Sequence, residues 1–186
     1  MLLVAKIGLV GDTGIGKTSF MNHIMNKNML SVGFYNQPTI GVDFNIKSFI
    51  YTNIKNKINI NWNIYDTAGQ ERFSPIVRTY YRICNIIILG FSDEESFNRL
   101  DIWLDQIKDY NDKAKIFFVK YKSDINNFNL SKKYGKVYEI SVKNNKGIDI
   151  LIEDINDYIY NNQDKMIIRD RIEIENNKFN LKSKCC

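Results

Sequence analysis

The feature that most constrains the fold is a glycine-rich segment placed between an apolar strand and a helix. Residues 11–18 read GDTGIGKT and match the spacing G-x-x-x-x-G-K-[ST]. The preceding residues 2–10 have the apolar pattern of a buried strand, and a helical pattern runs from about Lys17 to Asn26. This placement predicts a loop whose backbone N–H groups converge on phosphate oxygens at the N-terminus of a helix.

Side chains of this segment, which we call the phosphate loop (residues 11–18), have expected ligand contacts. Lys17 is expected to reach the β- and γ-phosphates, and the Thr18 hydroxyl is expected to bind Mg²⁺. The ligand-contacting residues predicted here are Asp12, Thr13, Gly14, Ile15, Gly16, Lys17, Thr18 and Ser19. Asp12 occupies a variable position of the motif, and its side chain is expected to face solvent.

Strand and helix patterns alternate along the rest of the chain. Residues 42–50 and 57–65 alternate with period two and predict a hairpin joined through 53–56. Further strands are predicted at 83–91, 116–119 and 137–141, and helices at 96–110, around 130–134 and at 148–160. The order predicts an α/β fold of the P-loop NTPase type: a six-stranded, mostly parallel sheet with one antiparallel edge strand and helices on both faces. One domain is expected over 1–165, followed by a flexible tail over 166–186.

Composition excludes several classes of protein. The 186 residues carry a net charge of +5, and no lysine or arginine stripe interleaved with aromatic residues suggests a nucleic-acid partner. No run of eighteen apolar residues spans a bilayer. The three cysteines lack zinc-ligand spacing; Cys84 lies in an apolar run and is expected in the core. A monomer in a reducing, intracellular environment is expected.

Four further segments carry a family resemblance. They are PTIGVDF at 38–44, YDTAGQERF at 65–73, YYR at 80–82 and DEESF at 93–97. Together with the phosphate loop they closely resemble the Ras superfamily of small GTPases, and within it the Rab family. The resemblance covers about residues 4–165 and the two terminal cysteines. It places Phe44, Tyr65 and Tyr80 in the family's aromatic effector-binding triad, where the middle position is usually tryptophan.

The resemblance implies the catalytic and metal-binding residues. Thr39 corresponds to the switch I threonine, whose hydroxyl and N–H meet Mg²⁺ and the γ-phosphate, and Asp66 would hold Mg²⁺ through water. The Gly69 N–H would bind the γ-phosphate, and Gln70 would orient the attacking water. The implied catalytic residues are therefore Gln70, Lys17 and Thr39, and the implied metal ligands are Thr18, Thr39 and Asp66. Because the phosphate loop has no arginine, intrinsic turnover should be slow, as in Ras-type GTPases, until a partner supplies one.

Base recognition is the part in which the sequence departs from the family. The usual N-K-x-D motif reads Tyr121-Lys122-Ser123-Asp124. Asp124 keeps the carboxylate for guanine N1 and N2, and Lys122 keeps the stem that packs on the base. Tyr121 lacks the amide that ties this loop to the phosphate loop, which predicts an affinity lower by about 1–3 kcal/mol. The EISVK segment implies that Ser141, Val142 and Lys143 back the base. Phe34 is the expected aromatic neighbour of guanine, and Tyr35 is the alternative.

The resemblance implies a molecular switch that binds GTP or GDP with Mg²⁺ and hydrolyses GTP during vesicle trafficking. Effectors, an exchange factor and a GTPase-activating protein are the expected partners, through the switch regions. Cys185 and Cys186 follow several lysines and resemble a doubly prenylated Rab tail, so lipid attachment at the cytoplasmic face of a vesicle or organelle membrane is expected. Two alternatives stay open: a prenylated scaffold that binds nucleotide weakly and hydrolyses little, and a P-loop kinase or ATPase.

Overall fold

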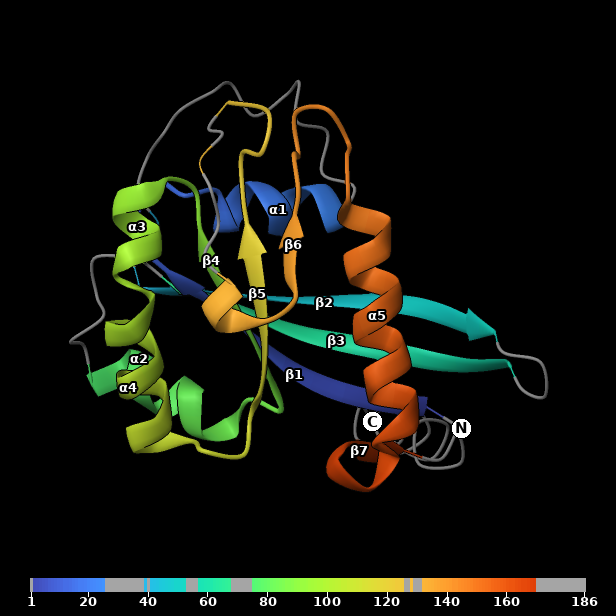
Figure 1. The fold of residues 1–186 in the computed structure, drawn as a ribbon. Helices are drawn as coiled ribbons and strands as arrows, with labels where there is room; N and C mark the ends of the chain where they lie inside the picture. The colour runs from blue at the N-terminus through green and yellow to red at the C-terminus, as the bar shows by residue number, and fades with distance from the viewer. Residues whose placement is uncertain are drawn as a thin grey trace, which may run out of the picture.

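A twisted β-sheet forms the centre of the protein in the computed structural model shown in Figure 1. The structure describes residues 2–25, 39, 41–52, 57–67, 75–125, 128 and 132–169. The strands are β1 (Leu2–Gly11), β2 (Val42–Thr52), β3 (Lys57–Thr67), β4 (Ile86–Phe91), β5 (Lys115–Lys120), β6 (Val137–Glu139) and β7 (Ile167–Arg169). The helices are α1 (Lys17–Ile24), α2 (Pro75–Ile83), α3 (Glu94–Asn98), α4 (Leu100–Tyr110) and α5 (Ile148–Asn161), with short 3₁₀ turns at Lys132–Tyr134 and Gln163–Lys165.

The predicted sheet is confirmed. Its strand order is β2-β3-β1-β4-β5-β6, in which β3, β1, β4, β5 and β6 are parallel and β2 is an antiparallel edge. The hairpin runs in register from Val42 opposite Thr67 to Thr52 opposite Lys57. A seventh strand, β7, is not among the predicted ones; it pairs antiparallel with the start of β1, so that regular structure continues beyond residue 166 to Arg169.

Several element boundaries differ from the sequence prediction. Ile83 ends α2 rather than opening a strand, and β4 begins after Asn85, whose side-chain oxygen accepts a hydrogen bond from the Lys6 N–H at 2.9 Å. The helix predicted at 96–110 is two helices. Asp93 caps the first, because its carboxylate accepts the Ser96 N–H at 2.8 Å. Of the helix predicted around 130–134, the described part is one 3₁₀ turn.

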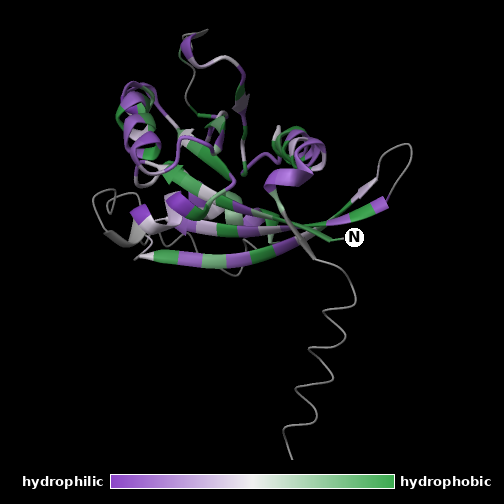
Figure 2. Cartoon of the chain, turned by 90° about the horizontal axis from the view of Figure 1, so that it is seen from below, coloured by the Kyte–Doolittle hydropathy of each residue, from purple (hydrophilic) through white to green (hydrophobic). Residues whose placement is uncertain are grey.

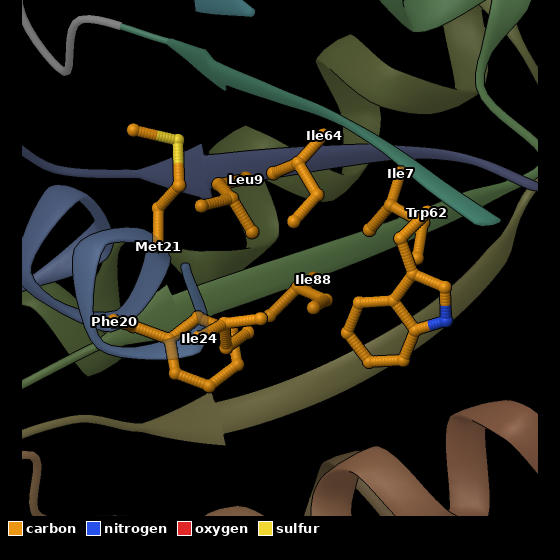
Figure 3. Close-up of a pocket in the computed structure, with 8 residues that line it drawn as sticks. All are labelled: Ile7, Leu9, Phe20, Met21, Ile24, Trp62, Ile64 and Ile88. Carbon is orange, nitrogen blue, oxygen red and sulfur yellow. The ribbon is translucent and has the colours of Figure 1, made fainter. Parts of the chain in front are cut away.

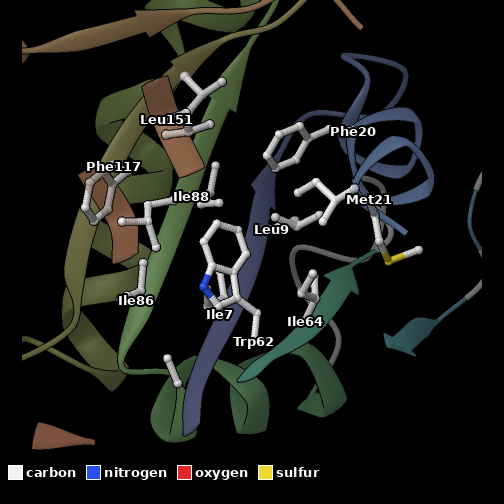
Figure 4. Packing of buried hydrophobic residues seen from close by; sticks show 14 of the residues in the cluster. Ile7, Leu9, Phe20, Met21, Trp62, Ile64, Ile86, Ile88, Phe117 and Leu151 are labelled. Carbon is white, nitrogen blue, oxygen red and sulfur yellow. The ribbon is translucent and has the colours of Figure 1, made fainter. Parts of the chain in front are cut away.

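Helices α1 and α5 cover one face of the sheet. Figure 4 shows side chains of both helices packed on Trp62 and on isoleucines of the central strands. The Trp62 indole N–H donates to the Asn156 side chain on α5 at 2.9 Å, so its polar atom is satisfied inside the core. The apolar pocket in Figure 3 belongs to this layer. It is lined by Ile7, Leu9, Phe20, Met21, Ile24, Trp62, Ile64 and Ile88, and this lining gives it no means of binding a phosphate.

Helices α2, α3 and α4 cover the opposite face with a second core. Its buried residues include Tyr81, Phe97, Leu100 and Trp103. Figure 2 shows hydrophilic and hydrophobic bands that alternate along the long strands, as in strands with one buried and one more exposed face. None of the helices that the structure describes is long and apolar enough to cross a bilayer.

Cys84 is expected to resist alkylation as long as the protein is folded. The side chain is 4% exposed, and burial raises the pKa of its thiol to about 12, so that almost no thiolate exists near neutral pH. In a variant with both terminal cysteines changed to serine, iodoacetamide should leave the native protein unmodified by mass and add one carbamidomethyl group after denaturation. Rapid labelling of the native protein would contradict this placement.

Candidate nucleotide-binding site

The carboxyl ends of the parallel strands meet at one edge of the sheet. There β1 ends at Gly11, β4 at Phe91, β5 at Lys120 and β6 at Glu139. Helix α1 begins at this edge with Lys17, directly after the phosphate loop. In open α/β sheets this edge is where ligands bind, so the fold brings the predicted motifs to a common place.

Lys17 lies folded back over the phosphate loop. Its ammonium group donates to the carbonyl oxygens of Gly11 and Asp12, each at 2.8 Å, and the residue is 5% exposed. Burial lowers the pKa of Lys17 to about 8, against the opposing charges of Asp66 and Asp12. Gly16, which precedes it, has φ +117°, a conformation that favours glycine. The loop thus holds a desolvated cation beside the helix N-terminus.

Three oxygen-bearing side chains converge next to this cation. The Thr18 hydroxyl donates to Asp66 Oδ2 at 2.5 Å and lies 2.9 Å from the Thr39 hydroxyl. The other carboxylate oxygen of Asp66, Oδ1, is buried without a hydrogen-bond partner among the described residues. Two hydroxyls and a carboxylate with a free oxygen are hard ligands, and they fit the small, oxygen-seeking Mg²⁺ ion. Burial raises the pKa of Asp66, whereas the Thr18 hydrogen bond and the Lys17 charge oppose that rise.

The segments that follow β5 and β6 meet beside the phosphate loop. The Ser141 hydroxyl donates to Asp124 Oδ1 at 2.6 Å, and this hydrogen bond lowers the pKa of Asp124. The Lys122 ammonium group donates to the Gly14 carbonyl oxygen at 2.6 Å. Val142 and Lys143 lie in a turn closed by the backbone pairing of Ser141 with Lys146. The described residues predicted for base recognition therefore lie on these two joined segments, and Lys122 contacts the phosphate loop.

Tyr121 has a position that the sequence does not predict. Its side chain is 1% exposed and packs edge-on against Phe20 with ring centroids 5.9 Å apart. A beta carbon added to Gly90 would lie 2.1 Å from Tyr121, so this glycine makes room for the side chain, whereas one added to Gly16 would lie 3.5 Å from it, in ordinary contact. The link to the phosphate loop that an amide would supply is replaced by apolar packing, together with the bond from Lys122.

Asp12 does not face solvent as predicted. It is 9% exposed, and its carboxylate is held from the α3–α4 junction. Arg99 contributes Nε at 2.7 Å and Nη2 at 2.6 Å to Oδ2, and the Trp103 indole donates to Oδ1 at 3.0 Å. The sequence pattern places Trp103 only on a packed helix face. The signal in the sequence that could have indicated this contact is that a tryptophan expected in the core has an indole N–H, which needs a hydrogen-bond acceptor.

An aromatic row links the two sheet strands of the hairpin to α2. The ring of Tyr65 lies 5.1 Å from that of Phe44 and 5.0 Å from that of Tyr80, centroid to centroid. Phe44 is 49% exposed, so the row reaches the surface. The grouping of these three residues implied by the family resemblance is therefore present in space.

The other predicted ligand contacts fall into two groups. Thr13, Gly14 and Ser19 are exposed at the same edge, and Ile15 is buried beneath the loop. The predictions for Phe34, Gly69, Gln70, Cys185 and Cys186 lie outside the described residues.

The chain is similar in sequence to known proteins. A family model described as "Ras of Complex, Roc, domain of DAPkinase" matches residues 6–124. The chain is 32% identical to Ras-related protein RabC of Dictyostelium discoideum, over 99% of this chain and 98% of the relative. It is 31% identical to Rab-11B of the same organism, over 84% and 74%, and 30% identical to Rab-18 of Lymnaea stagnalis, over 83% and 80%.

Proposed function

Because this chain belongs to the Rab family of small GTPases, we propose that it is a Mg²⁺-dependent switch that binds GTP and GDP at the edge formed by the phosphate loop. Its family membership makes it a GTP hydrolase. The observation that carries the proposal is the convergence of Lys17, Thr18, Thr39 and Asp66 at the carboxyl ends of the strands.

The site residues that the structure describes have these proposed roles in nucleotide binding. Lys17 and the backbone N–H groups of residues 12–19 would hold the β- and γ-phosphates, because the loop combines a cation with a helix N-terminus. Asp124 would accept hydrogen bonds from guanine N1 and N2, and the Ser141 hydroxyl orients its carboxylate. Lys122, Val142 and Lys143 would line the base.

The catalytic step needs positioning more than covalent chemistry. Mg²⁺, held by Thr18, Thr39 and Asp66, would offset charge on the phosphates when it is bound. Gln70 would orient the attacking water, while Lys17 stabilises charge on the phosphate oxygens. Phe34 and the Gly69 N–H complete the proposed set of contacts.

The proposed switch would act at a membrane. GTP would order residues 34–44 and 66–81 through Thr39 and Gly69, and hydrolysis would release them to change partner binding. The row of Phe44, Tyr65 and Tyr80 supports effector recognition, since Phe44 and Tyr80 belong to these segments and the Phe44 ring is exposed. Lipids on Cys185 and Cys186 would anchor residues 166–186, and thereby the domain over 1–165, to a vesicle or organelle in protein transport.

Nucleotide identification tests the proposal directly. The purified protein is expected to carry GDP, identified by mass after denaturation, and to bind GTP in preference to ATP when Mg²⁺ is present. Phosphate release from GTP should be slow. An empty site with no GTP turnover would favour the prenylated scaffold, and a preference for ATP would favour a kinase or ATPase.

Changing Asp124 to alanine is expected to weaken GDP binding by about 10- to 100-fold, because hydrogen bonds to a charged group are worth about 1.5–3 kcal/mol. ADP binding should change little, since adenine N1 offers this carboxylate no proton. Calorimetric titration of both nucleotides measures the effect. Asp101→Ala removes an exposed carboxylate on α4 and is the matched control. An equal loss for GDP and ADP would contradict a role in base recognition.

A further inference from the structure

Asp12 is bound by Arg99 and Trp103 through its side chain, and its main-chain carbonyl oxygen binds Lys17. Its carboxylate accepts three N–H contacts from Arg99 and Trp103, at distances of 2.6–3.0 Å. Its carbonyl oxygen accepts the Lys17 ammonium group at 2.8 Å. A displacement of the Asp12 backbone would therefore also displace the group expected to meet the phosphates.

The backbone just before Asp12 has little conformational freedom. Gly11 has φ +134°, and a beta carbon placed there would lie 2.3 Å from the Gly90 carbonyl oxygen. The end of β1 is thus pressed against β4, and Asp12 is the first residue beyond this constraint. Its side-chain contacts hold the chain at the point where the loop leaves the sheet.

Arg99 is itself oriented by a second carboxylate. It lies between α3 and α4, and its Nη1 contacts Glu95 Oε1 at 2.5 Å. The guanidinium therefore bridges Glu95, one turn earlier, and Asp12 on the phosphate loop. Two carboxylates on a planar fork fix its orientation better than one.

We propose that Arg99, with Trp103, clamps Asp12 so that the phosphate loop and Lys17 are arranged for the β-phosphate before the nucleotide binds. Arg99 is a positioning residue, because it acts through Asp12 and not on the ligand. The inference rests on the proposed function, since it concerns the same loop. By this proposal, residues of α3 and α4 and of their junction contribute to phosphate affinity. These residues belong neither to the phosphate-loop motif nor to the base-recognition segments.

The ligand series GDP and GMP separates positioning from general destabilisation. GMP lacks the β-phosphate, so it cannot bind Lys17 and gains much less than GDP from an ordered loop. Arg99→Ala is expected to weaken GDP binding by about tenfold and to leave GMP binding within about twofold of the parent. Arg99→Lys keeps the positive charge but lacks the planar guanidinium group. Its GDP affinity should therefore lie between those of the parent and Arg99→Ala. Lys133→Ala, which removes a cation paired with Asp101 on α4, is the control and should change neither affinity.

Hydrogen exchange in nucleotide-free protein provides a readout independent of the proposed function. Amides of residues 13–16 are expected to exchange at least several-fold faster in Arg99→Ala than in Lys133→Ala, whereas amides of β4 and β5 are unchanged. Equal losses for GDP and GMP, no loss for either, or unchanged exchange in the loop would overturn the clamp. If the parent bound no guanine nucleotide, the proposed function would fail, and the exchange rates would still decide the clamp.

Discussion

Lys17→Ala is expected to bind GTP at least about 100-fold more weakly than the parent, and GDP, which offers one phosphate contact fewer, about 10- to 100-fold more weakly. The ammonium group is already desolvated beside the loop, with hydrogen bonds to the Gly11 and Asp12 carbonyl oxygens, so binding phosphate requires little reorganisation. A charge-assisted hydrogen bond contributes about 1.5–3 kcal/mol, and each 1.4 kcal/mol is a factor of about ten in affinity. Two phosphate contacts give the stated loss for GTP. Titration with a fluorescent GDP analogue and competition with GTP measure it.

Stability measurements distinguish this loss from unfolding. Burial lowers the pKa of Lys17 to about 8, because the charged ammonium group is less stable inside the fold than in water. Removing this side chain should therefore not lower the melting temperature of the nucleotide-free protein. Added GDP should raise the melting temperature of the parent and much less that of the variant. Lys136→Ala, which removes a lysine paired with Asp154 away from the site, should behave as the parent. A Lys17→Ala protein that holds GTP as firmly as the parent would refute the proposed phosphate site.

The sheet and the phosphate loop can be predicted because their signals are local. The period-two pattern of Ile58, Ile60, Trp62 and Ile64 is written in consecutive residues, and the structure buries all four. The loop motif likewise lies between a strand and a helix that its neighbours define. Element ends are less predictable. The start of β4 depends on Asn85, whose amide also donates to the Lys165 carbonyl oxygen 80 residues away.

The contacts that set the loop in place are not predictable because they join distant parts of the chain. Arg99 meets Asp12 across 87 positions, and a solvent-facing aspartate and a buried, clamped one look alike in sequence. The departure at Tyr121 is visible in the sequence, but its consequence is not. Apolar packing can replace the missing amide contact only because Gly90, 31 positions earlier in the chain, leaves space for the ring. The sequence therefore predicts which residues gather at the site, and the structure adds which of them hold one another.

Gly90→Ala is expected to destabilise the fold, and its cost should depend on Tyr121. The added methyl would lie 2.1 Å and 2.8 Å from two ring carbons of Tyr121 and 3.2 Å from Ile15 Cδ1, so the ring must move within a packed core. Overpacking of this kind costs about 1–3 kcal/mol. For a chain of this length each kcal/mol lowers the melting temperature by about 2–4 °C.

The coupling between the two positions is the decisive measurement. Tyr121→Ala alone should cost about 3–5 kcal/mol, because it leaves a cavity beneath the phosphate loop. In that background the methyl of Gly90→Ala meets no ring, so the second substitution should cost much less than it does in the parent. Chemical unfolding of the four proteins gives the interaction free energy as a double-mutant cycle. Additive costs would show that the ring does not fill the space beside Gly90, and the apolar tie between the base loop and the phosphate loop would then be wrong.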